Sequence, residues 1–271
     1  MILLLSDFEM IQHSFYGGHD ITVVPIFDVH LGSEECMEEE FEQFIQTVKE
    51  REHIYVVLGG DLVDNGLKNS LTNVYRQKYM PSEQKRRMAK LLEPIRDRIL
   101  CSVSGNHEAR SARECDDSVT YDIMSKLDLE HLCREYMAFV KIKLGKEYAR
   151  DGAVTDGTRR PTYVLVVTHG AGGGGMLTGG AVNRGERFGY VVDGMDALIV
   201  GHTHKPFTTQ TGKIYIDRQN NQIGVKPFKV ISATSWLRYG GYAAGKMLLP
   251  SSHDIQTLTL GGRKKELVVT M

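Results

Sequence analysis

The most constraining feature of this sequence is a repeated arrangement in which an apolar run stops at a short polar motif. ITVVPIF ends at Asp28-Val29-His30, IYVVL leads into GGDLVDNG, and ILCSV stops at SGNHEAR. Later in the chain YVLVVT ends at His169, and ALIV runs into GHTH. Short apolar runs bounded by glycine and polar residues are typical of buried strands. Because ligands bind beyond the carboxyl ends of strands in α/β sheets, the five motifs are expected to converge on one site.

Helical spacing of apolar residues predicts three further elements between these strands. They cover Glu35–Arg51, Ser82–Arg98 and Val119–Leu132, and Pro94 is expected to kink the second helix. The part of the chain after Pro206 is rich in predicted strands. Its last segment, LTLGGRKKELVV, predicts a hairpin that turns at Gly261–Gly262.

Composition limits the class of protein. No linker-like segment divides the 271 residues, so we expect a single domain over 1–271, with the motifs inside 21–205 and a strand-rich part at 206–271. The 33 Lys and Arg nearly balance the 34 Asp and Glu, which argues against a nucleic-acid coat protein or a membrane-surface binder. No apolar run approaches the roughly 20 residues that a membrane span needs. Four cysteines without a C-x-x-C pair indicate reduced thiols, and hence a cytoplasmic protein.

The polar motifs contain the side chains of a metal centre. They offer two carboxylates, one amide oxygen and four imidazoles, namely Asp28, Asp61, Asn106, His30, His169, His202 and His204. Oxygen and nitrogen ligands without thiolate suit Mn²⁺, Fe or Zn²⁺, and seven are too many for one tetrahedral ion. They suit two ions about 3.5–4 Å apart that share a carboxylate. In D-x-H and H-x-H the two outer residues share a face if the chain is extended, whereas a turn would let the histidines reach different ions.

A competing interpretation comes from the glycine-rich segment GAGGGG, Gly170–Gly175, which satisfies the dinucleotide-binding pattern G-x-G-x-x-G after a strand. That pattern requires a helix to follow. The next residues, MLTGGAVNRGER, contain three glycines, each of which weakens a helix by about 1 kcal/mol. The dinucleotide interpretation also leaves His169 and the other four motifs unexplained, so we reject it.

In this order, D-x-H, G-D-x-x-D-N, G-N-H-E, H-G and G-H-T-H resemble the motifs of the calcineurin-like metallophosphoesterase superfamily. The resemblance covers Ile21 to about Lys205. It implies an α/β fold, a four-layer α/β/β/α sandwich of two mixed sheets flanked by helices.

The resemblance also implies roles for individual residues. Asp28, His30 and His204 would hold a first divalent ion, Asp61 would bridge, and Asn106, His169 and His202 would hold a second. His107 matches the catalytic histidine that is not a ligand, while Asp64 and Asn65 would support the ligands. The reaction implied is attack of a metal-activated hydroxide on a phosphoester, with Mn²⁺ preferred over Fe or Zn²⁺ as the ion. Arg110 is a candidate phosphate ligand, and a surface role for it is equally compatible with the sequence.

The substrate is less constrained than the chemistry. DVHLGS followed by an acidic helix resembles phosphodiesterase and nuclease members, so we expect a phosphodiesterase that acts on nucleic acid or nucleotides. GNHEAR also resembles protein phosphatases, but these carry arginine where this chain has Asn65 and they lack GHTH. A phosphomonoesterase, of protein or small-molecule type, therefore remains an alternative. A non-catalytic metal-binding subunit of a nucleic-acid complex is a third possibility, although every ligand position is filled.

Overall fold

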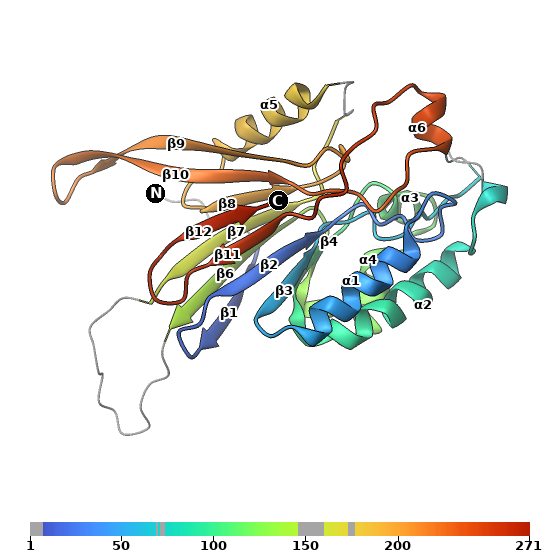
Figure 1. Cartoon of the computed structure of the whole chain (residues 1–271), viewed down its shortest axis with the longest axis horizontal. Coiled ribbons are helices and arrows are strands. Elements are labelled where there is room, and N and C mark those ends of the chain that lie inside the picture. The colour runs from blue at the N-terminus through green and yellow to red at the C-terminus, as the bar shows by residue number, and fades with distance from the viewer. Residues whose placement is uncertain (1–7, 69, 71–73, 146–159, 173–176) are drawn as a thin grey trace.

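The computed structural model describes residues 8–68, 70, 74–145, 160–172 and 177–271, and it contains two six-stranded sheets (Figure 1). One sheet has the order β12-β11-β2-β3-β4-β5. Its strands are β2 (Ile21–Ile26), β3 (Ile54–Leu58), β4 (Ile99–Val103), β5 (Cys133–Arg134), β11 (Thr257–Leu260) and β12 (Leu267–Thr270). The strands β2 to β5 are parallel, and the β11–β12 hairpin adds an antiparallel edge next to β2.

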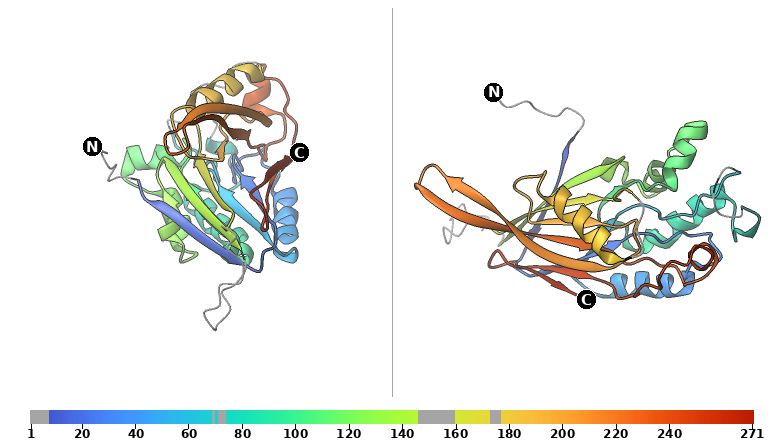
Figure 2. Two further views of the ribbon diagram at one scale, coloured as in Figure 1. Left: turned by 90° about the vertical axis from the view of Figure 1, so that its left-hand side faces the viewer. Right: turned by 90° about the horizontal axis from the view of Figure 1, so that it is seen from above.

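The other sheet has the order β1-β6-β7-β8-β10-β9. Its strands are β1 (Met10–Tyr16), β6 (Met137–Gly145), β7 (Thr162–Thr168), β8 (Ala197–Val200), β9 (Phe207–Asp217) and β10 (Gln222–Ser232). The strands β7, β8 and β10 are parallel to one another, β9 runs antiparallel to β10, and the parallel pair β1 and β6 joins the sheet through the antiparallel pairing of β6 with β7. Both sheets are therefore mixed. The ends of β9 and β10 project beyond the rest of the sheet as a long hairpin (Figures 1 and 2).

Helices flank the two sheets on their outer sides. The sheet that contains β2 is accompanied by α1 (Glu38–Glu50), α2 (Pro81–Leu92) and α4 (Val119–Ser125), and the other sheet by α5 (Thr178–Gly189) (Figure 2). Two further helices, α3 (Glu108–Cys115) and α6 (Gly241–Gly245), and three 3₁₀ turns, η1 (Val74–Arg76), η2 (Glu93–Arg98) and η3 (Glu130–Leu132), complete the described elements. The α/β fold with two mixed sheets and flanking helices, expected from the sequence, is confirmed.

The strand β7 shows why its sequence is apolar on both faces. Leu165 and Val167 pack into the larger core together with residues of the opposite sheet, such as Val57. Val166, which points the other way, packs with Ala181 of α5 in a second core. A strand buried on both faces has no reason to alternate between apolar and polar residues.

The predicted elements correspond closely to the observed ones, except at helix ends. All five strands that precede polar motifs are present. The predicted helix over 82–98 is divided into α2 and the 3₁₀ turn η2 at Pro94, as expected from the missing N–H of proline. The stretch over 119–132 likewise contains α4 and then η3. The C-terminal hairpin exists, but its strands are joined through residues 261–266 rather than by a two-residue turn.

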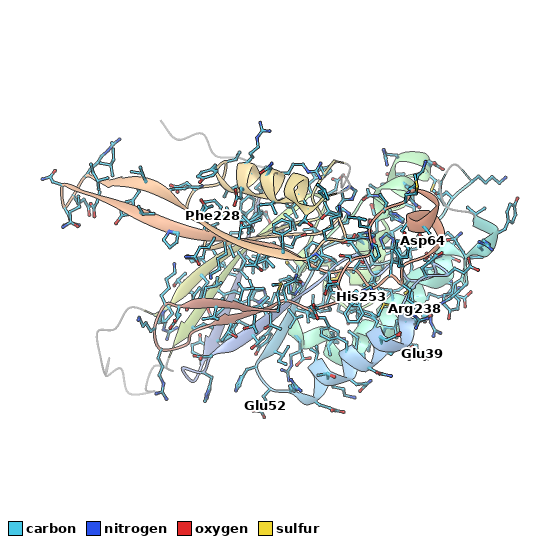
Figure 3. All side chains as sticks on the ribbon, turned by 45° about the horizontal axis from the view of Figure 1, so that its top comes forward. Glu39, Glu52, Asp64, Phe228, Arg238 and His253 are labelled. Carbon is cyan, nitrogen blue, oxygen red and sulfur yellow. The ribbon has the colours of Figure 1, made fainter. Side chains whose placement is uncertain are left out.

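One structural expectation was wrong. We argued that Gly179, Gly180 and Gly185 would weaken any helix after Gly175, yet α5 begins at Thr178. A Cβ atom on Gly185 would lie 2.7 Å from Val230, and one on Gly189 would lie 2.3 Å from the Phe228 ring of β10 (Figure 3). The glycines therefore let α5 pack closely on the sheet, and this contact outweighs their low helix propensity. Gly173–Gly175 themselves lie outside the described residues.

The hydroxyl of Tyr163 in β7 connects the two sheets. It donates a hydrogen bond to the Gly261 carbonyl oxygen at 2.8 Å and accepts one from the Glu266 main-chain N–H at 2.9 Å. Both partners belong to the connection between β11 and β12 in the other sheet. The Tyr163 side chain is fully buried, so no water can replace this hydroxyl.

We expect Tyr163→Phe to lower the free energy of unfolding by about 1–3 kcal/mol, because it leaves buried main-chain groups without a partner. Urea unfolding followed by the fluorescence of Trp236, the only tryptophan, measures this change. Tyr239→Phe, which alters a half-exposed tyrosine, is the matched control. An equal effect of the two substitutions would contradict a structural role for the Tyr163 hydroxyl.

Candidate metal centre

The polar motifs lie where strands β2, β3, β4, β7 and β8 end, and the backbone turns sharply there. Six residues of these motifs have a positive φ between 44° and 67°, namely Asp28, His30, Asp61, Asn65, His202 and His204. Asp, Asn and His tolerate this left-handed conformation better than most residues, but it still costs free energy. Such strain is typical of functional sites, where the surrounding structure holds it in place.

The first group of ligand atoms comes from the ends of β2 and β8. Asp28, His30 and His204 bring their nitrogen and oxygen atoms within 4.8 Å of one another. Asp28 Oδ1 lies 3.2 Å from His204 Nε2 and 3.8 Å from His30 Nε2, and the two Nε2 atoms are 3.3 Å apart. The other carboxylate oxygen of Asp28 accepts the His202 main-chain N–H at 2.9 Å. This bond fixes the direction in which Oδ1 points.

The second group is formed by Asp61, His169 and His202. Asp61 Oδ2 lies 3.3 Å from His169 Nε2 and also 3.8 Å from His30 Nε2, so it stands between the two groups. Its partner oxygen Oδ1 accepts the His107 main-chain N–H at 2.8 Å. Asn106 completes this side, because its Oδ1 lies 3.0 Å from His169 Nε2.

The chemistry of these donors fits divalent cations. His169 donates its Nδ1–H to the Gly59 carbonyl oxygen at 2.9 Å, so in the neutral ring Nε2 carries a lone pair. In that neutral ring Nε2 faces two further acceptors, the oxygens of Asn106 and Asp61, whereas a protonated ring would direct its Nε2–H toward them. Asp28 Oδ1 is likewise buried with no hydrogen-bond donor among the described residues. Converging lone pairs of this kind are the arrangement that a metal ion satisfies.

Electrostatics within the cluster lead to the same conclusion. Burial alone lowers the pKa of His169, but the adjacent Asp61 carboxylate, which also accepts its hydrogen bond, raises it to about 10. Burial raises the pKa of Asp61, yet the surrounding histidines hold it well below its ordinary value. Burial and the neighbouring His107 lower the pKa of His30 to about 3. In the protein without cations, protons on histidine therefore offset the carboxylate charges, and metal ions must displace them.

His107 and Arg110 lie beside the cluster rather than within the two groups above. His107 donates Nδ1–H to the Asp64 main-chain oxygen at 2.7 Å, which directs its Nε2 toward Asp61 Oδ2, 3.8 Å away. Arg110 donates to the same Asp64 oxygen at 3.3 Å. Burial lowers the pKa of His107, but the carboxylates of Asp61 and Asp64, the latter 3.4 Å from Nδ1, raise it above its ordinary value. The structure also places atoms of His30, Asp64 and His107 within 4.8 Å. Asp64 is labelled in Figure 3.

Asn65 does not face the ligand atoms but anchors α3. Its Nδ2 donates to the His107 carbonyl oxygen at 2.8 Å and to Ser111 Oγ at 2.9 Å. Its own main-chain N–H donates to Gln84 Oε1 at 2.8 Å. Gln84 is a fully buried residue of α2 that the sequence analysis did not select, because a single glutamine in a helix carries no recognisable signal.

Glu108 is the most consequential residue that the sequence analysis did not select. Its buried carboxylate accepts four main-chain N–H groups, from Asp61 at 2.9 Å, Leu62 at 2.7 Å, Val63 at 3.3 Å and Gly105 at 2.9 Å. It therefore holds the loop after β3 against the loop after β4. The sequence offered one indication of this role, because Glu108 is the last residue of the G-N-H-E motif and follows two polar residues.

The two motifs with i, i+2 spacing behave differently. Asp28 and His30 enter the same ligand group, whereas His202 and His204 are divided between the two groups. All four residues have a positive φ, so φ alone does not distinguish the two motifs. The second of the two alternatives holds for GHTH because its histidines enter different groups.

A cavity of about 920 Å³ opens beside the second group of ligands. Asn106, His169 and His202 line one end of it, whereas the residues of the first group, Asp28 and His30, do not. Its walls come from α3, α5 and the turn that joins β5 to β6. A volume of this size accommodates a small organic ligand.

The family model of the calcineurin-like phosphoesterases matches residues 22–206, and the chain belongs to this family. It is therefore a metal-dependent hydrolase of phosphoesters, whose His and Asp side chains supply divalent metal sites. No curated protein matches the chain.

Three solved structures are similar to this one at low sequence identity. A predicted phosphoesterase from Streptococcus pneumoniae TIGR4 is 11% identical, with 89% of this chain and 83% of that chain covered, at a TM-score of 0.35. A metallophosphoesterase from Sphaerobacter thermophilus is 13% identical, with 89% and 83% covered, at a TM-score of 0.38. An NAD nucleotidase from Haemophilus influenzae is 9% identical, with 93% of this chain and 49% of that chain covered, at a TM-score of 0.42.

Within the described residues, no helix is long and apolar enough to cross a membrane.

We expect Glu108→Gln to weaken Mn²⁺ binding by about 10–100-fold, a typical cost of losing support for metal ligands. The amide presents an NH₂ group to two main-chain N–H donors that the carboxylate now accepts, so the loop that carries Asp61 loses its anchor. Calorimetric titration of metal-stripped protein with Mn²⁺ measures the affinity. Glu114→Gln, an exposed change in the same helix, should bind Mn²⁺ as the unmodified protein does. Unchanged affinity in Glu108→Gln would show that the loop does not need this anchor.

Proposed function

We propose that this protein is a phosphodiesterase that acts on nucleotide or nucleic-acid substrates with two divalent ions, Mn²⁺ in preference to Fe or Zn²⁺. The observation that carries this proposal is the cavity beside the second ligand group. Here the space next to Asn106 and His202 is large enough for a nucleoside attached to the scissile phosphate.

Seven side chains would hold the ions. Asp28, His30 and His204 would bind one, Asn106, His169 and His202 the other, and Asp61 would contact both. The position of Asp61 Oδ2 between the two groups supports its bridging role. Two cations bound there would supply a water of lowered pKa and would stabilise negative charge on the phosphoryl oxygens.

The surrounding residues would position the substrate and move a proton. The Nε2 atom of His107 points into the cluster because Nδ1 is engaged by the Asp64 oxygen. This orientation allows Nε2 to donate a proton to the departing ester oxygen or to hydrogen-bond a phosphoryl oxygen. Arg110, held against the same Asp64 oxygen, would contact the phosphate from its side. Asp64 thus sets the direction of both groups.

We expect metal-stripped protein restored with Mn²⁺ to hydrolyse bis-p-nitrophenyl phosphate in preference to p-nitrophenyl phosphate. His107→Ala should lower kcat on the diester by about 100-fold or more, since general acid catalysis contributes about 10²–10⁴-fold. It should leave the Mn²⁺ content unchanged, because His107 belongs to neither proposed ligand set. His131→Ala, an exposed histidine, is the matched control for both readouts.

The possible results separate the alternatives. Preference for the monoester would replace the proposal with a phosphatase. Binding of two metal ions without hydrolysis of either ester, or of single-stranded DNA and RNA, would favour a non-catalytic binding subunit. Loss of Mn²⁺ in His107→Ala would show that this residue is a ligand and that its proposed role is wrong.

A further inference from the structure

The cavity beside the metal centre has aromatic walls. Tyr121 and Tyr136 line it on the side of α4 and β6, and Phe188 of α5 together with Phe207 lines the other side. The two tyrosines are exposed, with 51% and 71% of their surface accessible, although they belong to this cavity. Aromatic faces without protein partners provide stacking surfaces for planar rings such as nucleobases.

Arg184 supplies a cation to the α5 side of this cavity. The residue is half-buried, and its guanidinium lies next to Gly172, three residues beyond the ligand His169. Its Nη2 is covered from solvent and has no hydrogen-bond acceptor within the described part of the chain. Among the described residues, no carboxylate lies within 4.0 Å of it. A half-buried charge with an unused donor is costly unless an anion completes it.

Other polar atoms of the same cavity also lack partners. Arg134 Nε, Thr203 Oγ1 and Ser232 Oγ line it, and each is without a hydrogen-bond partner in the described part of the chain. The carboxylates of Glu130 and Glu135 belong to the segment that contains Tyr136 rather than to α5, and they are exposed to solvent. An anion would therefore bind on the Arg184 side, with its uncharged part toward the tyrosines.

We propose that this cavity binds the nucleoside next to the scissile phosphate, and that Arg184 binds the second phosphate of that nucleoside. This inference rests on the proposed phosphodiesterase function and defines its substrate as a nucleotide chain with consecutive phosphates. The Arg110 guanidinium, in contrast, already donates a hydrogen bond to the Asp64 main-chain oxygen. The two arginines would thus contact successive phosphates, Arg110 the one that reacts and Arg184 the one beyond the nucleoside.

Binding by the full chain tests this without any turnover. Thymidine 3′,5′-bisphosphate should bind the Mn²⁺-loaded protein at least tenfold more tightly than thymidine 5′-monophosphate in calorimetric titration. Arg184→Met should abolish this advantage, and Arg184→Lys, which keeps the charge but not the two-pronged geometry, should retain part of it. Arg187→Met, an exposed change one turn nearer the end of the same helix, should keep the whole advantage.

Hydrolysis provides the second measurement. Two thymidine dinucleotides are compared, one with a terminal phosphate on the leaving nucleoside and one without it. Arg184→Met should lower the ratio of their kcat/KM values about tenfold, mainly by raising KM for the dinucleotide with the terminal phosphate. An unchanged ratio with both activities reduced would place Arg184 on the scissile phosphate and overturn the inference. Equal affinity of the unmodified protein for the two thymidine nucleotides would also overturn it. If instead the protein hydrolyses no diester while the bisphosphate preference depends on Arg184, the catalytic proposal fails and the binding site stands.

Discussion

The buried carboxylate of Glu108 is the interaction on which the geometry of the metal centre depends. It gathers four main-chain N–H groups from two loops that follow different strands. One of them belongs to Asp61, the residue between the two ligand groups. A buried carboxylate is tolerable only because each of its oxygens accepts more than one N–H. Glu108, which belongs to neither proposed ligand set, thus positions Asp61, which is a proposed ligand.

Strained backbone is the second requirement of the site. Asp28, His30, His202 and His204 all adopt left-handed conformations, which cost free energy at every non-glycine residue. The packed strands before each motif compensate for this cost, since most of their residues are buried. Rigid strands therefore end in strained loops, and these loops direct the side chains toward one point.

In the proposed function, the cavity extends the site from metal chemistry to substrate recognition. One of its ends is formed by ligand side chains, and its walls are formed by α5 and by the turn before β6. It differs from the metal centre because some of its polar atoms, among them Arg184 Nη2 and Thr203 Oγ1, have no hydrogen-bond partner among the described residues. The metal chemistry follows from the family, whereas the proposed substrate is argued from Arg184 and the aromatic walls of the cavity.

The sequence by itself determined the family, the five strands and the residue types that could bind metal, because each motif follows an apolar run and its letters carry the chemistry. It also predicted that these motifs would meet. Residue spacing alone left open whether His202 and His204 share an ion, whereas the family resemblance predicted that they divide, and the structure places them in different groups. The helix α5 was wrongly excluded because its glycines were read by propensity alone, without the contacts to Val230 and Phe228. The anchoring by Glu108 and the cavity beside Arg184 join segments far apart in the chain, so only tertiary structure could decide them.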